Sequence, residues 1–159
     1  MAAVLWCCFL TAVVVVSYLS FQNGDEAKAV GEKFISYLAG RRYPGREATT
    51  QEILMLTYEV RQMGRVCAFF AMGILGTAAI HISCGKCNWL IKTCIMGIVL
   101  VAIAYLTERL KIYIPTRHYS YEEMMLSMTA TVMGFILVSV VTLTFQLLKG
   151  FFRLVAAVH

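Results

Sequence analysis

The chain has 159 residues, of which 60% are hydrophobic and only 14% are charged, and its formal net charge is +5. A soluble domain of this size would carry roughly a quarter charged residues, so the composition favours a membrane protein. The positive charge is not gathered into a basic run. This excludes a typical nucleic-acid-binding surface and suits contact with membrane lipid headgroups.

The first predicted element is an apolar segment at residues 2–21, which contains no charged side chain. An α-helix of this length measures about 30 Å, which is the thickness of the hydrocarbon core of a bilayer. A cleaved signal peptide is the alternative interpretation. No Lys or Arg precedes the apolar run, however, and the run is long for a signal peptide. We therefore expect a retained transmembrane helix.

A polar connector follows at residues 22–65. Its apolar residues between Ala27 and Leu38 recur at helical spacing, which predicts an amphipathic helix on the membrane surface. Thr49 and Glu52 then form a capping-box pattern, which is typical of the start of a helix. We expect this helix to continue directly into the next apolar segment.

Three further apolar segments complete an all-α, polytopic membrane protein with a bundle of four transmembrane helices in a single domain (1–159). The short sequence between the second and third segments cannot hold a domain, so these helices should form an antiparallel hairpin. Small residues indicate where helices approach closely, among them Gly73 and the pair Ala130 and Gly134. The three segments span about residues 66–84, 90–106 and 124–148.

Six cysteines lie inside or beside the apolar segments, which excludes the disulfide framework of a small secreted domain. Cys84 and Cys87 form a CxxC motif, and His81 and Cys94 complete four nominal zinc ligands. His81 and Cys94 are expected on transmembrane helices, where the four side chains could converge only with difficulty. We therefore favour packing residues or free thiols over a disulfide or redox pair. A metal site is the least favoured interpretation, and we expect no cofactor.

The connector between the last two segments concentrates charge. Glu108 ends an apolar helix, where a carboxylate opposes the helix dipole, so it should have a cationic partner. Lys111, Arg109 and Arg117 are the candidates. Ser120 begins an S-x-x-E capping box that explains the start of the last helix but not the presence of Arg117.

This connector resembles the VanZ-like family of bacterial membrane proteins. Lys111 stands where the family has glutamine, Glu123 for aspartate, Ser127 for asparagine and Ala130 for glycine. A second block resembles the family where the second transmembrane helix begins, with Arg61 retained and Arg65 and Phe69 in place of a histidine and a tyrosine. The residues that carry the first block are Glu108, Lys111, Ile114, Pro115, Arg117, Ser120, Glu123, Ser127, Ala130 and Gly134.

The resemblance implies a multi-pass protein of the bacterial cytoplasmic membrane and cell envelope. The family's namesake is associated with low-level resistance to the glycopeptide teicoplanin. Because the second helix begins where the third ends and the fourth begins, the charged residues should meet at one membrane face. Arginines there could bind an anionic lipid headgroup or a lipid-linked cell-wall component. The predicted polar cluster comprises Arg61, Arg65, Glu108, Lys111, Arg117, Glu123 and Ser127.

Three alternatives to ligand binding remain. The cluster could be a structural ion-pair network that locks the bundle. The chain could be an accessory subunit of a larger membrane complex. It could also be a membrane enzyme with Glu123 or His118 as a general base, although the sequence contains no recognisable catalytic motif and no evident nucleophile.

Overall fold

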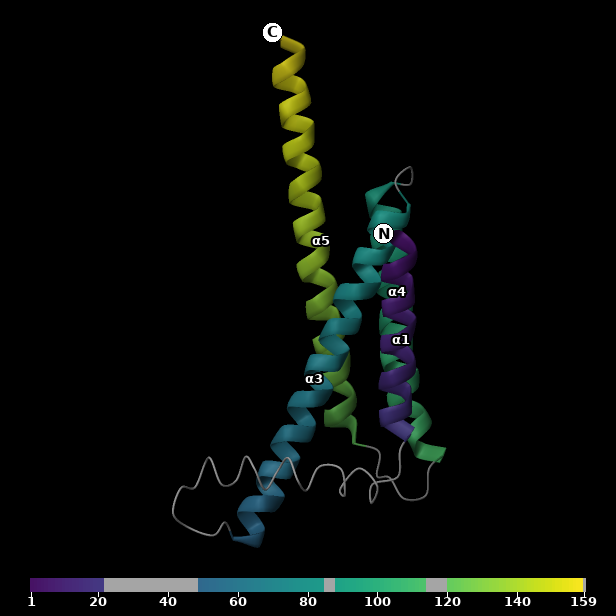
Figure 1. The fold of residues 1–159 in the computed structure, drawn as a ribbon, viewed down its shortest axis with the longest axis vertical. Helices are drawn as coiled ribbons and strands as arrows, with labels where there is room; N and C mark the ends of the chain where they lie inside the picture. Colours follow the sequence, from purple (N-terminus) through teal and green to yellow (C-terminus); the bar gives the residue numbers. More distant parts are fainter. Residues whose placement is uncertain (22–48, 85–87, 114–119, 159) are drawn as a thin grey trace.

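The computed structural model describes residues 1–21, 49–84, 88–113 and 120–158, and within these ranges the chain is helical without strands (Figure 1). The all-α class is therefore confirmed for the described residues. The elements are α1 (Ala2–Phe21), α3 (Thr50–Ser83), α4 (Trp89–Arg109), the 3₁₀ helix η1 (Leu110–Tyr113) and α5 (Tyr121–Val158).

Three of these helical stretches are long and apolar enough to cross a membrane. They are Gln51–Ser83, Trp89–Tyr113 and Tyr121–Arg153. This supports the prediction of a membrane protein. The helix predicted at residues 2–21 is present as α1, but a fourth membrane crossing by α1 stays a prediction.

Two helices are longer than the apolar segments that predicted them. α3 begins at Thr50 as one continuous helix, and at its start the Glu52 carboxylate accepts the backbone N–H of Thr49 at 2.8 Å, as the capping-box pattern indicates. α5 continues to Val158. With 34 and 38 residues, the two helices measure about 51 and 57 Å, well beyond a 30 Å hydrocarbon core. In Figure 1 the first half of α3 and the last part of α5 project from opposite ends of the bundle.

The hydrophobic core lies where all four helices meet. α4 contributes a stripe of buried side chains at intervals of four residues, which is the spacing of one helical face. α1 packs against this core through Phe9 and Val16. The full cluster of buried core residues is Phe9, Val16, Phe69, Met72, Met96, Leu100, Ala104 and Ala130.

α3 and α5 cross with their backbones in direct contact. A Cβ atom added to Gly73 would overlap the carbonyl oxygen of Thr131, and one added to Gly134 would overlap the carbonyl oxygen of Phe70. Only glycine permits this approach, which membrane helices use to gain packing energy that the surrounding lipid does not supply. The predicted close approach at Gly73 and Gly134 is confirmed.

Candidate functional site

A group of charged side chains lies where α3, α4, η1 and α5 meet, at the end of the bundle where α4 ends and α5 begins. We call this end the charged end and the group the charge cluster. The side chains of Glu108 and Lys111 are only 2% and 3% exposed, so the centre of the cluster is fully buried. The charge cluster comprises Arg65, Glu108, Lys111, Glu123 and Ser127.

Glu108 is the hub of the charge cluster. Its Oε2 atom accepts a hydrogen bond from Lys111 Nζ at 2.6 Å, and its Oε1 atom accepts one from Ser127 Oγ at 3.1 Å. Arg65 Nε lies 4.0 Å from Oε1. The carboxylate therefore contacts residues of three helices. A carboxylate at the C-terminal end of a helix needs a cationic partner, and Lys111 is confirmed as the partner of Glu108.

Arg65 and Glu123 form the outer half of the charge cluster. Arg65 Nη1 lies 2.6 Å from Glu123 Oε2, but its N–H bonds are not directed at that oxygen, so the contact is an ion pair without a well-formed hydrogen bond. The two side chains are 13% and 25% exposed. Glu123 is also the glutamate of the capping-box pattern at the start of α5. Its ion pair with Arg65 thus joins α5 to α3.

The helical spacing of α4 explains why Glu108 points inward. Met96, Leu100 and Ala104 are buried at intervals of four residues, and Glu108 occupies the next position of the same stripe. η1 then tightens the backbone and brings Lys111, three residues later, back to the carboxylate. The charge cluster therefore continues the hydrophobic core. The positive charges of its two cations balance the negative charges of its two carboxylates.

One of the seven predicted residues, Arg61, is described by the structure but is not part of the charge cluster. Arg61 lies one turn before Arg65 on α3, is exposed, and forms no ion pair with another described residue. Arg117 lies outside the described residues. The structure therefore brings together five predicted residues and leaves Arg61 as a neighbouring exposed cation on the same helix.

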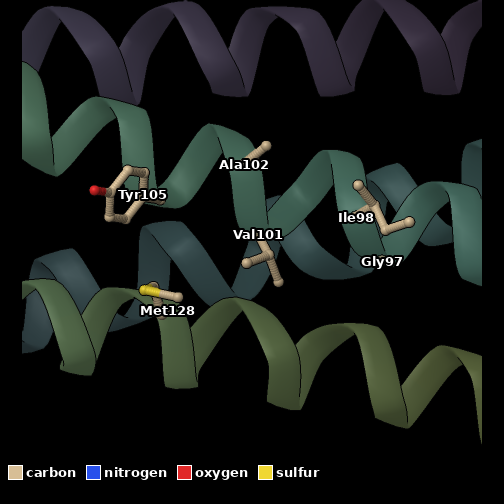
Figure 2. Close-up of a pocket in the computed structure, with 6 residues that line it drawn as sticks. All are labelled: Gly97, Ile98, Val101, Ala102, Tyr105 and Met128. Atoms are coloured by element: carbon tan, nitrogen blue, oxygen red, sulfur yellow. The ribbon is translucent and has the colours of Figure 1, made fainter.

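A shallow apolar groove of about 480 Å³ is lined by residues of α4 and by Met128 of α5 (Figure 2). Tyr105 is one turn before Glu108, and Met128 follows Ser127. The hydropathy of α4 and α5 did not predict the groove. The small residues Gly97 and Ala102, at an interval of five in α4, are the only sequence signal for it. The lining residues are Gly97, Ile98, Val101, Ala102, Tyr105 and Met128.

Three of the four nominal zinc ligands lie among the described residues. Cys87 lies outside the described residues, and the other three are His81 on α3, the half-buried Cys84 at its end and the exposed Cys94 on α4. Among the described residues no group of three His, Cys, Asp or Glu side chains is placed to hold a metal ion.

Comparisons with protein-family models, with curated proteins and with solved structures found no match to this chain. A function for the chain is therefore inferred from its own geometry. The relevant features are the buried charge cluster, the exposed cation Arg61 beside it, and the apolar groove that leads to it.

Proposed function

We propose that the chain is a VanZ-like integral membrane protein of the bacterial cell envelope that binds an anionic lipid or a lipid-linked cell-wall component. α1 is its fourth transmembrane helix. The hydrocarbon chain of the ligand occupies the groove between α4 and α5, and the anionic headgroup contacts Arg61 and Arg65. The observation that carries this proposal is that the groove ends at Tyr105 and Met128, directly beside the charge cluster.

This arrangement matches the chemistry of a lipid. A lipid ligand needs an apolar surface along its chain and charged or polar groups at the depth of its headgroup. Arg65 contacts Glu108 and Glu123 through Nε and Nη1 only, so N–H donors of its guanidinium remain available. Arg61, four residues earlier, lies on the same face of α3. Two guanidinium groups side by side suit a phosphate group.

The VanZ-like resemblance supports the same location. Glu108, which the resemblance retains, belongs to the charge cluster, and so do Lys111, Glu123 and Ser127, three positions at which the chain departs from the family pattern.

Filling the groove should weaken lipid binding without unfolding the protein. We expect Ala102→Phe to reduce binding of a polyisoprenyl phosphate about tenfold, or ~1.4 kcal/mol, because the ring occupies the space of the hydrocarbon chain. Native mass spectrometry of the protein in detergent, titrated with this lipid, measures the change. Ala71→Phe is the matched control, since Ala71 is exposed on α3 and does not line the groove.

A neutral polyisoprenol of the same length tests the role of the charge. It should bind more weakly than the phosphate, since it offers nothing to Arg61 and Arg65. Equal binding of the two lipids, or equal binding by both phenylalanine variants, would contradict the proposed site.

Expression of the chain in a susceptible bacterium should raise the teicoplanin concentration that stops growth. Arg61→Gln should abolish this effect while leaving the protein abundance in the membrane unchanged, because Arg61 is exposed and forms no ion pair with another described residue. Arg153→Gln, which removes an exposed arginine near the far end of α5, should retain it. A wild-type chain that leaves susceptibility unchanged would remove the resistance role but not lipid binding.

An accessory subunit of a membrane complex is the second candidate. The last part of α5 projects beyond the other helices (Figure 1). Its large apolar side chains are exposed, which suits a protein partner. If this is the main role, the chain should bind the polyisoprenyl phosphate no better than the neutral lipid. The exposed side chains include Phe145, Leu147, Phe151 and Phe152.

A further inference from the structure

A buried lysine lies near each end of α4, Lys92 in its first turn and Lys111 just beyond its end, in η1. Lys92 and Lys111 are 5% and 3% exposed. Glu108 neutralises Lys111, but Lys92 forms no ion pair with a described residue. The described acidic residues all belong to the charged end or to the first half of α3, and the undescribed turn 85–87 contains no acidic residue. Lys92 therefore lies at an end of the bundle where the described helices offer it no carboxylate.

This opposite end, where α3 ends and α4 begins, we call the tryptophan end. Trp6 Nε1 donates a hydrogen bond to Ser83 Oγ at 2.7 Å, and Trp89 stacks on His81 with ring centroids 6.3 Å apart. Tryptophan side chains favour the depth of lipid headgroups. A buried lysine one turn inside this end is thus close to the level at which lipid phosphates lie.

His81 is the first unpaired neighbour of Lys92. Both of its ring nitrogens are buried and have no hydrogen-bond partner among the described residues. Its ring stacks on Trp89, three residues before Lys92 on α4, so His81 lies beside the first turn of α4. An imidazole always carries at least one N–H, so His81 can donate a hydrogen bond in either protonation state.

Ser139 is the second unpaired neighbour, and the helix register places it opposite Lys92. Trp89 Nε1 donates to Thr142 Oγ1 at 3.3 Å, and further along Gly97 faces the ring of Phe135, so α4 and α5 run antiparallel. One turn inside the tryptophan contact, the facing positions are Lys92 and Ser139. Ser139 is 6% exposed, and its Oγ has no hydrogen-bond partner among the described residues.

Three polar side chains from three helices, each without a partner among the described residues, are costly unless they share a ligand. A lysine that is 5% exposed and has no counter-charge among the described residues is expensive in a membrane, and the buried polar atoms of His81 and Ser139 add their own desolvation cost. An ammonium, a hydroxyl and an imidazole N–H together suit an oxyanion. The first turn of α4, in which Lys92 lies, contributes the positive end of its helix dipole.

We propose that Lys92, His81 and Ser139 bind a phosphate group at the tryptophan end of the bundle. The phosphate belongs either to the headgroup of an anionic membrane lipid or to inorganic phosphate. This site lies at the opposite end from Arg61 and Arg65. Failure of either proposal therefore leaves the other standing.

Tryptophan fluorescence gives a direct test. The chain has two tryptophans, so Trp6→Phe leaves Trp89, which stacks on His81, as a single reporter. This variant is placed in nanodiscs of phosphatidylcholine and titrated with inorganic phosphate, or reconstituted with rising fractions of phosphatidylglycerol. A saturable change in the first arm identifies free phosphate. A change only in the second identifies the lipid headgroup. No saturable change in either arm overturns the proposal.

Matched variants connect the signal to the three residues. Lys92→Met should abolish it and should fold, because it replaces a buried unpaired charge with an apolar side chain of similar length. Ser139→Ala should weaken binding about tenfold, or ~1.4 kcal/mol. Lys149→Met, which removes an exposed lysine ten residues after Ser139 on α5, should leave the titration unchanged. If the Lys92→Met variant gives the same fluorescence titration as its parent, the proposal is overturned.

Trp6→Phe also removes the hydrogen bond to Ser83, so the unmodified chain provides a second readout. In the arm that gives a signal, phosphate or phosphatidylglycerol should raise its thermal unfolding midpoint, as a ligand of the folded state does. The same addition should not raise the midpoint of Lys92→Met. Equal shifts in the two proteins would mean that the anion acts elsewhere.

Discussion

Glu108→Ala is expected to lower the free energy of unfolding by about 3–5 kcal/mol, because it leaves Lys111 buried without its counter-charge. The same substitution removes the acceptor for Ser127 Oγ, the contact that joins the end of α4 to α5. Equilibrium unfolding of the purified protein in mixed micelles of dodecylmaltoside and rising fractions of dodecyl sulfate measures the change. Glu122→Ala is the matched control, since Glu122 is exposed in the same polar region and should lose only a few tenths of a kcal/mol of dipole energy.

The double variant Glu108→Ala, Lys111→Met separates the ion pair from the general loss of packing. If Glu108→Ala lowers the free energy of unfolding because Lys111 is left buried without a counter-charge, replacing Lys111 with methionine should restore much of the stability. An apolar pair is often as stable as a buried salt bridge. The two single effects should therefore not be additive. Additive losses would show that Glu108 and Lys111 contribute independently, and the ion pair at 2.6 Å would then not be what holds the charged end together.

A structural lock and a ligand site are compatible within this cluster because its two halves differ. Glu108 and Lys111 are enclosed and satisfy each other, which suits a fixed support. Arg65 and Glu123 are partly exposed, and their contact lacks a directed hydrogen bond. A headgroup phosphate could therefore compete for Arg65 without disturbing the buried pair.

The helix bounds show how far hydropathy alone predicts this fold. The segment predicted at residues 2–21 coincides with α1, because a continuous apolar run and the helix share the same limits. The prediction for α5 ended at Leu148, but the helix continues through Gly150 to Val158. A glycine inside a helix costs only about 1 kcal/mol relative to alanine, which is too little to end a helix with apolar residues on both sides.

The contacts at the charged end could be predicted from the sequence only in part. The helix dipole indicates that Glu108 needs a cation, and Lys111 is a candidate within one turn, so this contact follows from local chemistry. The contacts of Arg65 with Glu123 and of Ser127 with Glu108 join separate helices. Their formation depends on how α3, α4 and α5 pack against one another, which no local pattern specifies. The unpaired state of Lys92 likewise becomes visible only once its neighbours are placed.

Gly134→Leu is expected to destabilise the protein by about 3 kcal/mol or more, at or beyond the upper end of ordinary overpacking costs. A side chain at Gly134 meets the carbonyl oxygen of Phe70 and the backbone nitrogen of Ile74, and a backbone cannot rotate away as a flexible side chain can. α3 and α5 must then separate, which also draws Arg65 away from Glu123. Unfolding in the same mixed micelles, and the abundance of the variant in membranes, measure the effect.

Gly150→Leu makes this test specific, because it is the same chemical change on the same helix with a predicted effect of opposite sign. A Cβ atom at Gly150 meets nothing within 4 Å. The substitution should therefore leave stability unchanged or raise it by up to ~1 kcal/mol through the higher helix propensity of leucine. If the two variants lose equal stability, the penalty comes from added bulk on α5 in general. A loss confined to Gly134 means that the backbone contact between α3 and α5 sets the spacing on which the charge cluster depends.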